Sequence, residues 1–106
     1  MTLIAEQTLD LLGSDEGVLV RLFAPVQVDA ETWSCRHEIG SPIAETLDSQ
    51  GVTSLQALAL ALRNLSAALY SHPLYKQGKL GAYGEFAGYL GVPAPSTYHQ
   101  FAPFPF

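Results

Sequence analysis

Cysteine and basic residues are both scarce in this sequence. Among 106 residues there is one cysteine, Cys35, and only five residues are Lys or Arg. A single cysteine cannot form a disulfide within the chain or supply a cysteine-rich zinc cage. Ten acidic residues bring the net charge to −5, and the basic residues are scattered singly, so no cluster exists to neutralise nucleic-acid phosphates. We therefore expect no disulfide scaffold and no nucleic-acid partner.

Long apolar runs are also missing before the C-terminal tail. The longest uncharged stretch there is about 14 residues, between Asp48 and Arg63, and a helix needs roughly 20 apolar residues to span a bilayer. The N-terminal segment MTLIAEQTLDLL has no basic region and contains two acidic residues, which is unlike a signal peptide. These features predict a cytoplasmic protein with no membrane partner.

The low charge content also bears on assembly. Charged residues make up 14% of the chain, whereas about 25% is typical of soluble domains. A small protein with so little charge tends to cover apolar surface with a partner or a second copy of itself. We expect a single domain over residues 1–93, an extended Pro/Phe-rich tail over residues 94–106, and a homodimer.

Alternating apolar and polar residues predict an antiparallel meander of about four strands. The predicted strands cover residues 2–12, 18–25, 32–39 and 43–47. The glycine-flanked turn GSDEG joins the first two. In the third strand, Trp33, Cys35 and His37 share one face, whereas Ser34 and Arg36 lie on the other. Since the second set is polar, we expect Trp33 and Cys35 to face the core.

One amphipathic helix is predicted over Ser54–His72. Thr53 is the N-cap and Gln56 completes a capping box, in which each side chain reaches the other's backbone N–H. Leu60 falls on the polar side, and Pro73 disfavours further helix. The apolar stripe expected to cover the sheet consists of Leu55, Leu58, Leu62, Leu65 and Leu69. The fold class is therefore α+β, with one long helix packed on one face of the sheet.

Glycine and aromatic residues concentrate after Pro73. A short helix is predicted over Ala82–Leu90, ended by Gly91 and Pro93. The glycines indicate turns and close packing, because no phosphate-binding loop pattern is present. Apolar residues that would leave exposed surface are the candidate interaction residues Leu60, Tyr83, Phe86, Tyr89, Phe101 and Phe104.

Side chains able to perform chemistry are few. Cys35 and His37 lie two residues apart on one strand face, about 6.5–7 Å along the strand, which does not readily allow a hydrogen bond between nucleophile and base. We expect Cys35 to be a core residue. A metal site would have to recruit His72 and His99 from distant segments, so we expect no metal and no cofactor. The remaining candidate pocket consists of Trp33, Arg36 and His37.

Two stretches resemble known proteins. The strand segment WSC (Trp33–Cys35) and the segment GVTSLQAL (Gly51–Leu58) resemble a family of small uncharacterised bacterial proteins with a W-x-C strand and a G-x-[DT]-S-x-Q-A-L helix start. The helix entry is also similar to the S-Q-G-[DE]-T-x-x-E-A-L segment of HicB-type antitoxins, with Val52 and Gln56 in place of the usual acids. The second resemblance implies a small domain that blocks a toxin.

These observations favour a protein-binding function over an enzymatic one. Because the sequence shows no recognisable set of catalytic residues, we predict a non-enzymatic protein-binding module. The most specific form of this prediction is an antitoxin-like or immunity-like role. The alternative is a small ligand-binding domain or enzyme with a pocket around Trp33, Arg36 and His37.

Overall fold

The computed structural model describes residues 1–92, so the expected tail over residues 94–106 lies outside the described residues. The structure confirms the α+β fold class, since it contains an antiparallel sheet and one main helix. The sheet has seven strands rather than about four. The elements are β1 (Leu3–Leu11), β2 (Ser14–Phe23), β3 (Val26–Asp29), β4 (Thr32–Ile39), β5 (Glu45–Gly51), α1 (Ser54–Ser71), α2 (Pro73–Lys76), β6 (Leu80–Ala82) and β7 (Glu85–Phe86).

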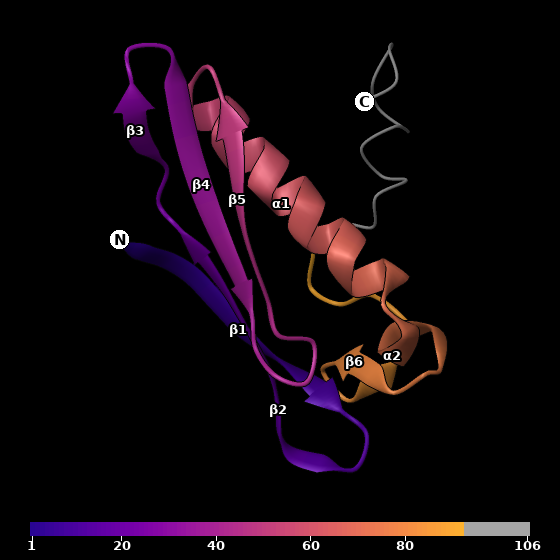
Figure 1. Cartoon of the computed structure of the whole chain (residues 1–106). Helices are drawn as coiled ribbons and strands as arrows, with labels where there is room; N and C mark the ends of the chain where they lie inside the picture. The colour runs from indigo at the N-terminus through magenta and orange to yellow at the C-terminus, as the bar shows by residue number, and fades with distance from the viewer. Residues whose placement is uncertain (93–106) are drawn as a thin grey trace.

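Strand β3 continues the path of β2 along the same edge of β4. Val20 pairs with Ile39 and Leu22 with His37, whereas Val26 pairs with Ser34. The pairing shifts by one residue between these segments, as expected where Pro25 interrupts a strand. No strand is predicted between residues 25 and 32, but Val26–Asp29 form one, which projects beyond β1 (Figure 1).

The connection between β1 and β2 is tighter than the predicted turn over residues 13–17. Leu11 pairs with Ser14, so the turn itself is Leu12-Gly13, with Gly13 at φ 85°. Gly17 lies within β2 at φ 70°, next to a shift in the pairing register. A side chain at Gly17 would clash with the carbonyl oxygen of Leu9. Gly17 therefore permits a β-bulge in β2 and is not part of the turn.

Helix α1 begins where the sequence predicts. The Thr53 hydroxyl accepts a hydrogen bond from the Gln56 N–H at 3.0 Å. The Gln56 side chain accepts in turn from the N–H of Val52 at 2.7 Å, one residue earlier than a capping box requires. The helix ends at Ser71, before His72 and Pro73. Both ends therefore follow from local interactions.

The helix face that packs on the sheet differs from the predicted leucine stripe. Ala57 and Ala61 are fully buried, whereas Leu55 in the first turn is 73% exposed. The small alanine side chains let the helix backbone approach the sheet, and this rotates the contact away from Leu55. The helix packs mainly on β4 and β5 (Figure 1). Leu65 and Leu69 are buried as predicted.

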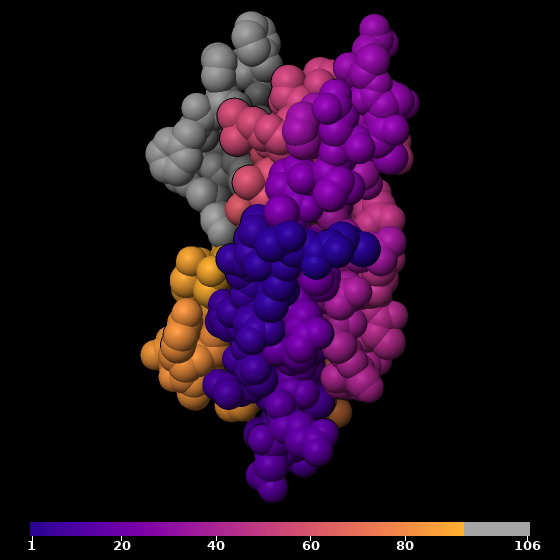
Figure 2. Space-filling view, turned by 90° about the vertical axis from the view of Figure 1, so that its left-hand side faces the viewer, coloured from indigo at the N-terminus to yellow at the C-terminus, as the bar shows by residue number. Residues whose placement is uncertain are grey.

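Residues 73–92 form a small lobe against the end of β1. The short helix predicted over Ala82–Leu90 is wrong, because this segment contains β6 and β7, joined by the two-residue turn Tyr83-Gly84. Strand β6 pairs with β1 at Asp10 and Leu11. Figure 2 shows this lobe, in orange and yellow, directly beside β1 in indigo. The pairing with β1 overrides the glycine-terminated helix pattern of the segment.

The core lies between the sheet and its cover. Its larger cluster joins β1, β2 and β4 to α1 and the lobe, through the buried residues Leu9, Val18, Val20, Ile39, Leu65, Leu69, Leu80, Ala82 and Leu90. A smaller cluster of Cys35, Ala57 and Ala61 lies under the first turns of α1. The opposite face of the sheet carries mostly polar and charged side chains, as is common for antiparallel sheets covered on one side.

Candidate functional site

The predicted pocket residues do not come together. Trp33 and His37 lie on the face of β4 that α1 covers, and Trp33 packs against the Cys35 cluster. Arg36 lies on the opposite face, where it contacts Asp48 of β5. The alternation of side chains along a strand places neighbouring residues on opposite faces. A pocket that contains both Arg36 and His37 is therefore not formed.

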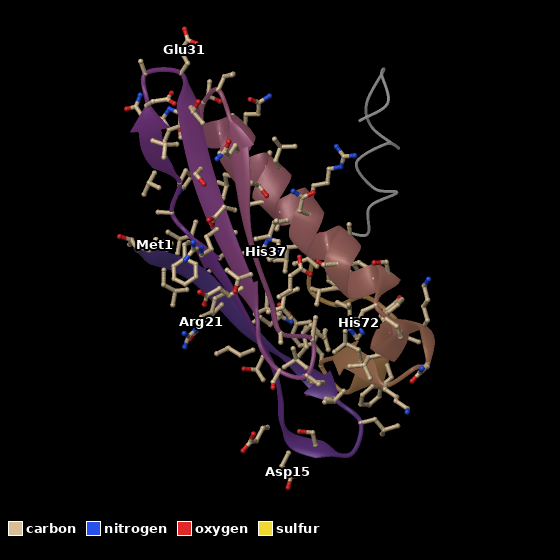
Figure 3. The ribbon with its side chains drawn as sticks, viewed as in Figure 1. Met1, Asp15, Arg21, Glu31, His37 and His72 are labelled. Carbon is tan, nitrogen blue, oxygen red and sulfur yellow. The ribbon has the colours of Figure 1, made fainter. Side chains whose placement is uncertain are left out.

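His37 is fully buried between the sheet and α1 (Figure 3). Its Nε2 atom lies 3.3 Å from Oε1 of Glu45, which is half-buried at the start of β5. No hydrogen-bond partner for Nδ1 occurs among residues 1–92. A buried polar atom without a partner is costly. Because the ring is fully buried, its surroundings are those of a core residue.

Cys35 is a core residue, as its position beside Trp33 predicts. Its side chain is fully buried, and the thiol donates a hydrogen bond to the carbonyl oxygen of Phe23 at 3.1 Å. Burial raises the pKa of the Cys35 thiol, and the nearby negative charge of Asp48 adds to the effect. A thiol held in its neutral form is a poor nucleophile. The buried, neutral Cys35 thiol therefore fits a role in the core rather than that of a nucleophile.

The uncovered face of the sheet carries a row of paired charges. Arg21 of β2 lies opposite Glu6 of β1, with Nε 3.3 Å from Oε2, and its other neighbour is Glu38. The Arg36 guanidinium contacts both oxygens of Asp48 at 2.7 and 2.9 Å. These hydrogen bonds lower the pKa of Asp48 and raise that of Arg36. Figure 3 shows Arg21 on the side of the sheet away from α1.

An apolar depression lies beside the Arg36–Asp48 ion pair. Its apolar lining comes from the N-terminus, from the connection between β2 and β3, and from β3, namely Met1, Ala24, Val26 and Val28. Val26 and Val28 are 47% and 59% exposed. The sequence analysis did not predict a strand with exposed valines here, because residues 26–31 also contain Gln and Asp. The short V-x-V alternation of residues 26–28 is the pattern that indicates such a strand.

The lobe exposes three aromatic side chains, which we call the aromatic surface. Tyr83, Phe86 and Tyr89 are 80%, 38% and 61% exposed. Tyr83 occupies the hairpin turn with φ 56°, a left-handed conformation that costs free energy in residues other than glycine. Of the other candidate interaction residues, Leu60 is half-buried on α1. Phe101 and Phe104 lie outside the described residues.

Hydrogen bonds hold the aromatic surface firmly to the domain. The Gly84 N–H donates to the carboxylate of Asp10 at 2.8 Å. The Tyr75 hydroxyl donates to the carbonyl of Gly88 at 3.1 Å, and the Tyr70 hydroxyl donates to that of Val92 at 2.6 Å. The rings of Tyr70 and Tyr75 also contact edge to face. The surface is therefore presented by a well-anchored lobe.

A comparison with family models places the chain in a family. Residues 5–94 match the model of a domain of unknown function, DUF6968. The chain belongs to this family. Neither the comparison with curated proteins nor that with solved structures gave a significant match. Within the described part of the chain, no three His, Cys, Asp or Glu side chains are grouped to hold a metal ion, and neither helix is suited to cross a membrane.

Proposed function

We propose that this chain is a non-catalytic protein-binding module that acts as a homodimer. The aromatic surface of Tyr83, Phe86 and Tyr89 supports this more than any other feature. Aromatic residues are enriched at protein interfaces, where they bury a large area with few rotatable bonds. Here they lie exposed in a chain with little charge. In the homodimer, a second copy of the chain covers this aromatic surface.

The backbone of the hairpin turn favours a functional role for Tyr83. A two-residue turn with φ above 0° at both positions prefers Asn, Asp or Gly at its first position. The chain instead places a tyrosine there, with its ring almost fully exposed. A residue that strains the fold and buries nothing within it is best explained by a contact outside it.

The distribution of charge supports an antitoxin-like or immunity-like role for this protein-binding module. The domain is acidic overall, and most of the excess negative charge falls within residues 26–51, which contain five acidic residues and one basic residue. A small acidic domain suits a basic protein partner, because complementary charge speeds encounter and disfavours wrong partners. The similarity of the helix entry to HicB-type antitoxins points the same way.

The homodimer is tested by sedimentation velocity of the full chain over a wide concentration range. Tyr83→Asn removes the exposed ring and puts a turn-favouring residue at φ 56°, so we expect equal or higher stability and at least a tenfold weaker dimer. Leu55→Asn is the matched control, because Leu55 is similarly exposed but lies on α1. A chain that is monomeric at every concentration contradicts the dimer.

The protein-binding role is tested by affinity capture of the tagged chain from its native host, with mass spectrometry of the bound proteins. We expect one basic protein in stoichiometric amount. Its release by Tyr83→Asn would mean that it shares the aromatic surface, whereas retention would mean that it binds elsewhere. Recovery of the chain alone would contradict the antitoxin-like role.

A further inference from the structure

Strand β3 has an unpaired outer edge. Within residues 1–92 it pairs only with β4, and all four of its residues, Val26–Asp29, are exposed. Figure 1 shows it at the margin of the sheet, beyond the N-terminal end of β1. Its outer backbone N–H and C=O groups are therefore available to a further strand.

The edge lacks two of the usual blocks against such pairing, although it is only four residues long and its register with β4 shifts between Gln27 and Asp29. Natural edge strands are commonly blocked by lysine or by proline within the strand. The sequence VQVD contains neither, since Pro25 precedes it. Backbone hydrogen bonds to an added strand supply affinity, and pockets for alternate side chains supply specificity. The depression lined by Val26 and Val28 beside the Arg36–Asp48 pair offers such a pocket.

Charge decides which kind of strand fits this edge. Beside β3 the chain carries Asp29 and Glu31 together with the paired Arg36 and Asp48, a formal charge of −2. Glu38 and Glu45 lie at the opposite end of β4 and β5. A second copy of the same edge would bring two such regions together, and like charges across an interface are unfavourable. A segment with lysine or arginine is attracted to the same region.

We propose that the β3 edge binds an extended, basic segment of a partner protein as an added strand. One aliphatic side chain of that segment occupies the depression beside Val26 and Val28, and its basic residues lie near Asp29 and Glu31. This inference rests on the proposed function, because its ligand is a protein segment. It adds a partner surface on another part of the fold from the aromatic surface.

The test uses the full chain, labelled with ¹⁵N, and the octapeptide VKVKVKVK as probe. We expect saturable shifts of the Val26–Asp29 amides and slower hydrogen exchange at this strand, because its outer N–H groups gain acceptors. The peptide VEVEVEVE has the same strand propensity and the opposite charge, so it is expected to bind far more weakly. Shifts spread over all acidic residues, without slower exchange in β3, would overturn the proposal.

Two lysine substitutions separate strand addition from simple charge attraction. Val28→Lys alters the edge and the depression, and Val52→Lys adds the same charge at a similarly exposed valine after β5. We expect Val28→Lys to weaken the peptide at least tenfold and Val52→Lys to change its affinity less than threefold. Equal losses would overturn the proposal, and unchanged spectra elsewhere would show that both variants fold.

Different results would contradict the β3 site and the protein-binding role. If the aromatic surface dimerises and a partner is captured, but Val28→Lys neither weakens the peptide nor releases that partner, the β3 site is wrong and the protein-binding role stands. If the chain captures no protein, the protein-binding role fails whatever the peptide does.

Discussion

The guanidinium of Arg36 makes two hydrogen bonds to the carboxylate of Asp48, at 2.7 and 2.9 Å, on the face of the sheet opposite to the neighbouring His37. Two-point contacts of this kind fix both side chains and tie β4 to β5. They also remove Arg36 from any pocket with His37. The expected three-residue pocket does not form because alternation along β4 places Arg36 and His37 on opposite faces, and the ion pair holds Arg36 on its face.

Asp48→Asn should make the stability of the domain less dependent on pH. Arg36 lowers the pKa of Asp48 in the folded chain, so the pair stabilises at neutral pH and this contribution is lost as the pH falls through that lowered pKa. Since both side chains are partly exposed, we expect less than about 1 kcal/mol. Urea unfolding from pH 7 to pH 2 should show the wild-type advantage shrinking below about pH 4.

His37→Leu should leave the domain as stable or make it more stable. The substitution removes the Nδ1 atom, which has no partner among the described residues, and puts an apolar side chain of similar size in its place. We expect a gain of up to about 1 kcal/mol, reduced by loss of the Glu45 contact. Chemical denaturation measures this. A large loss of stability would mean that the buried imidazole has a partner.

Gly91→Ala should destabilise more than Gly78→Ala. Both glycines have left-handed backbones, with φ 88° and 72°, and each substitution costs about 1–2 kcal/mol for that reason. A side chain at Gly91 would also lie 2.5 Å from the Gln7 amide, which donates to the Leu90 carbonyl. Apart from its two chain neighbours, no described residue lies within 4 Å of the position that a Cβ atom would take at Gly78. Thermal unfolding should give an additional loss of about 1 kcal/mol for Gly91→Ala, and equal losses would contradict the Gln7 contact.

Thr53→Ala should weaken the start of α1. The Thr53 hydroxyl accepts from the Gln56 N–H at 3.0 Å, and loss of such a cap costs about 1 kcal/mol. Thr53→Ser keeps the hydroxyl and serves as control. Urea unfolding followed by circular dichroism measures both. If the two variants are equally destabilised, the hydroxyl is not the stabilising group.

Much of the fold follows from local patterns in the sequence. Alternation over residues 32–39 predicted β4 and its buried face correctly, because successive side chains of a strand point to opposite faces. The Thr53–Gln56 contact and Pro73 marked both ends of α1. These features depend on residues close together in the chain, and a sequence displays them directly.

The tertiary structure decided the rest, since it depends on pairing between distant residues. Alternation cannot show that β3 continues β2 across Pro25, because that is set by the register with β4. Residues 80–86 form a hairpin because Asp10 and Leu11 pair with β6, more than 60 residues away. Alanines rather than Leu55 face the sheet, because close helix packing favours small side chains there. The exposed aromatic surface and the open β3 edge are products of these long-range contacts.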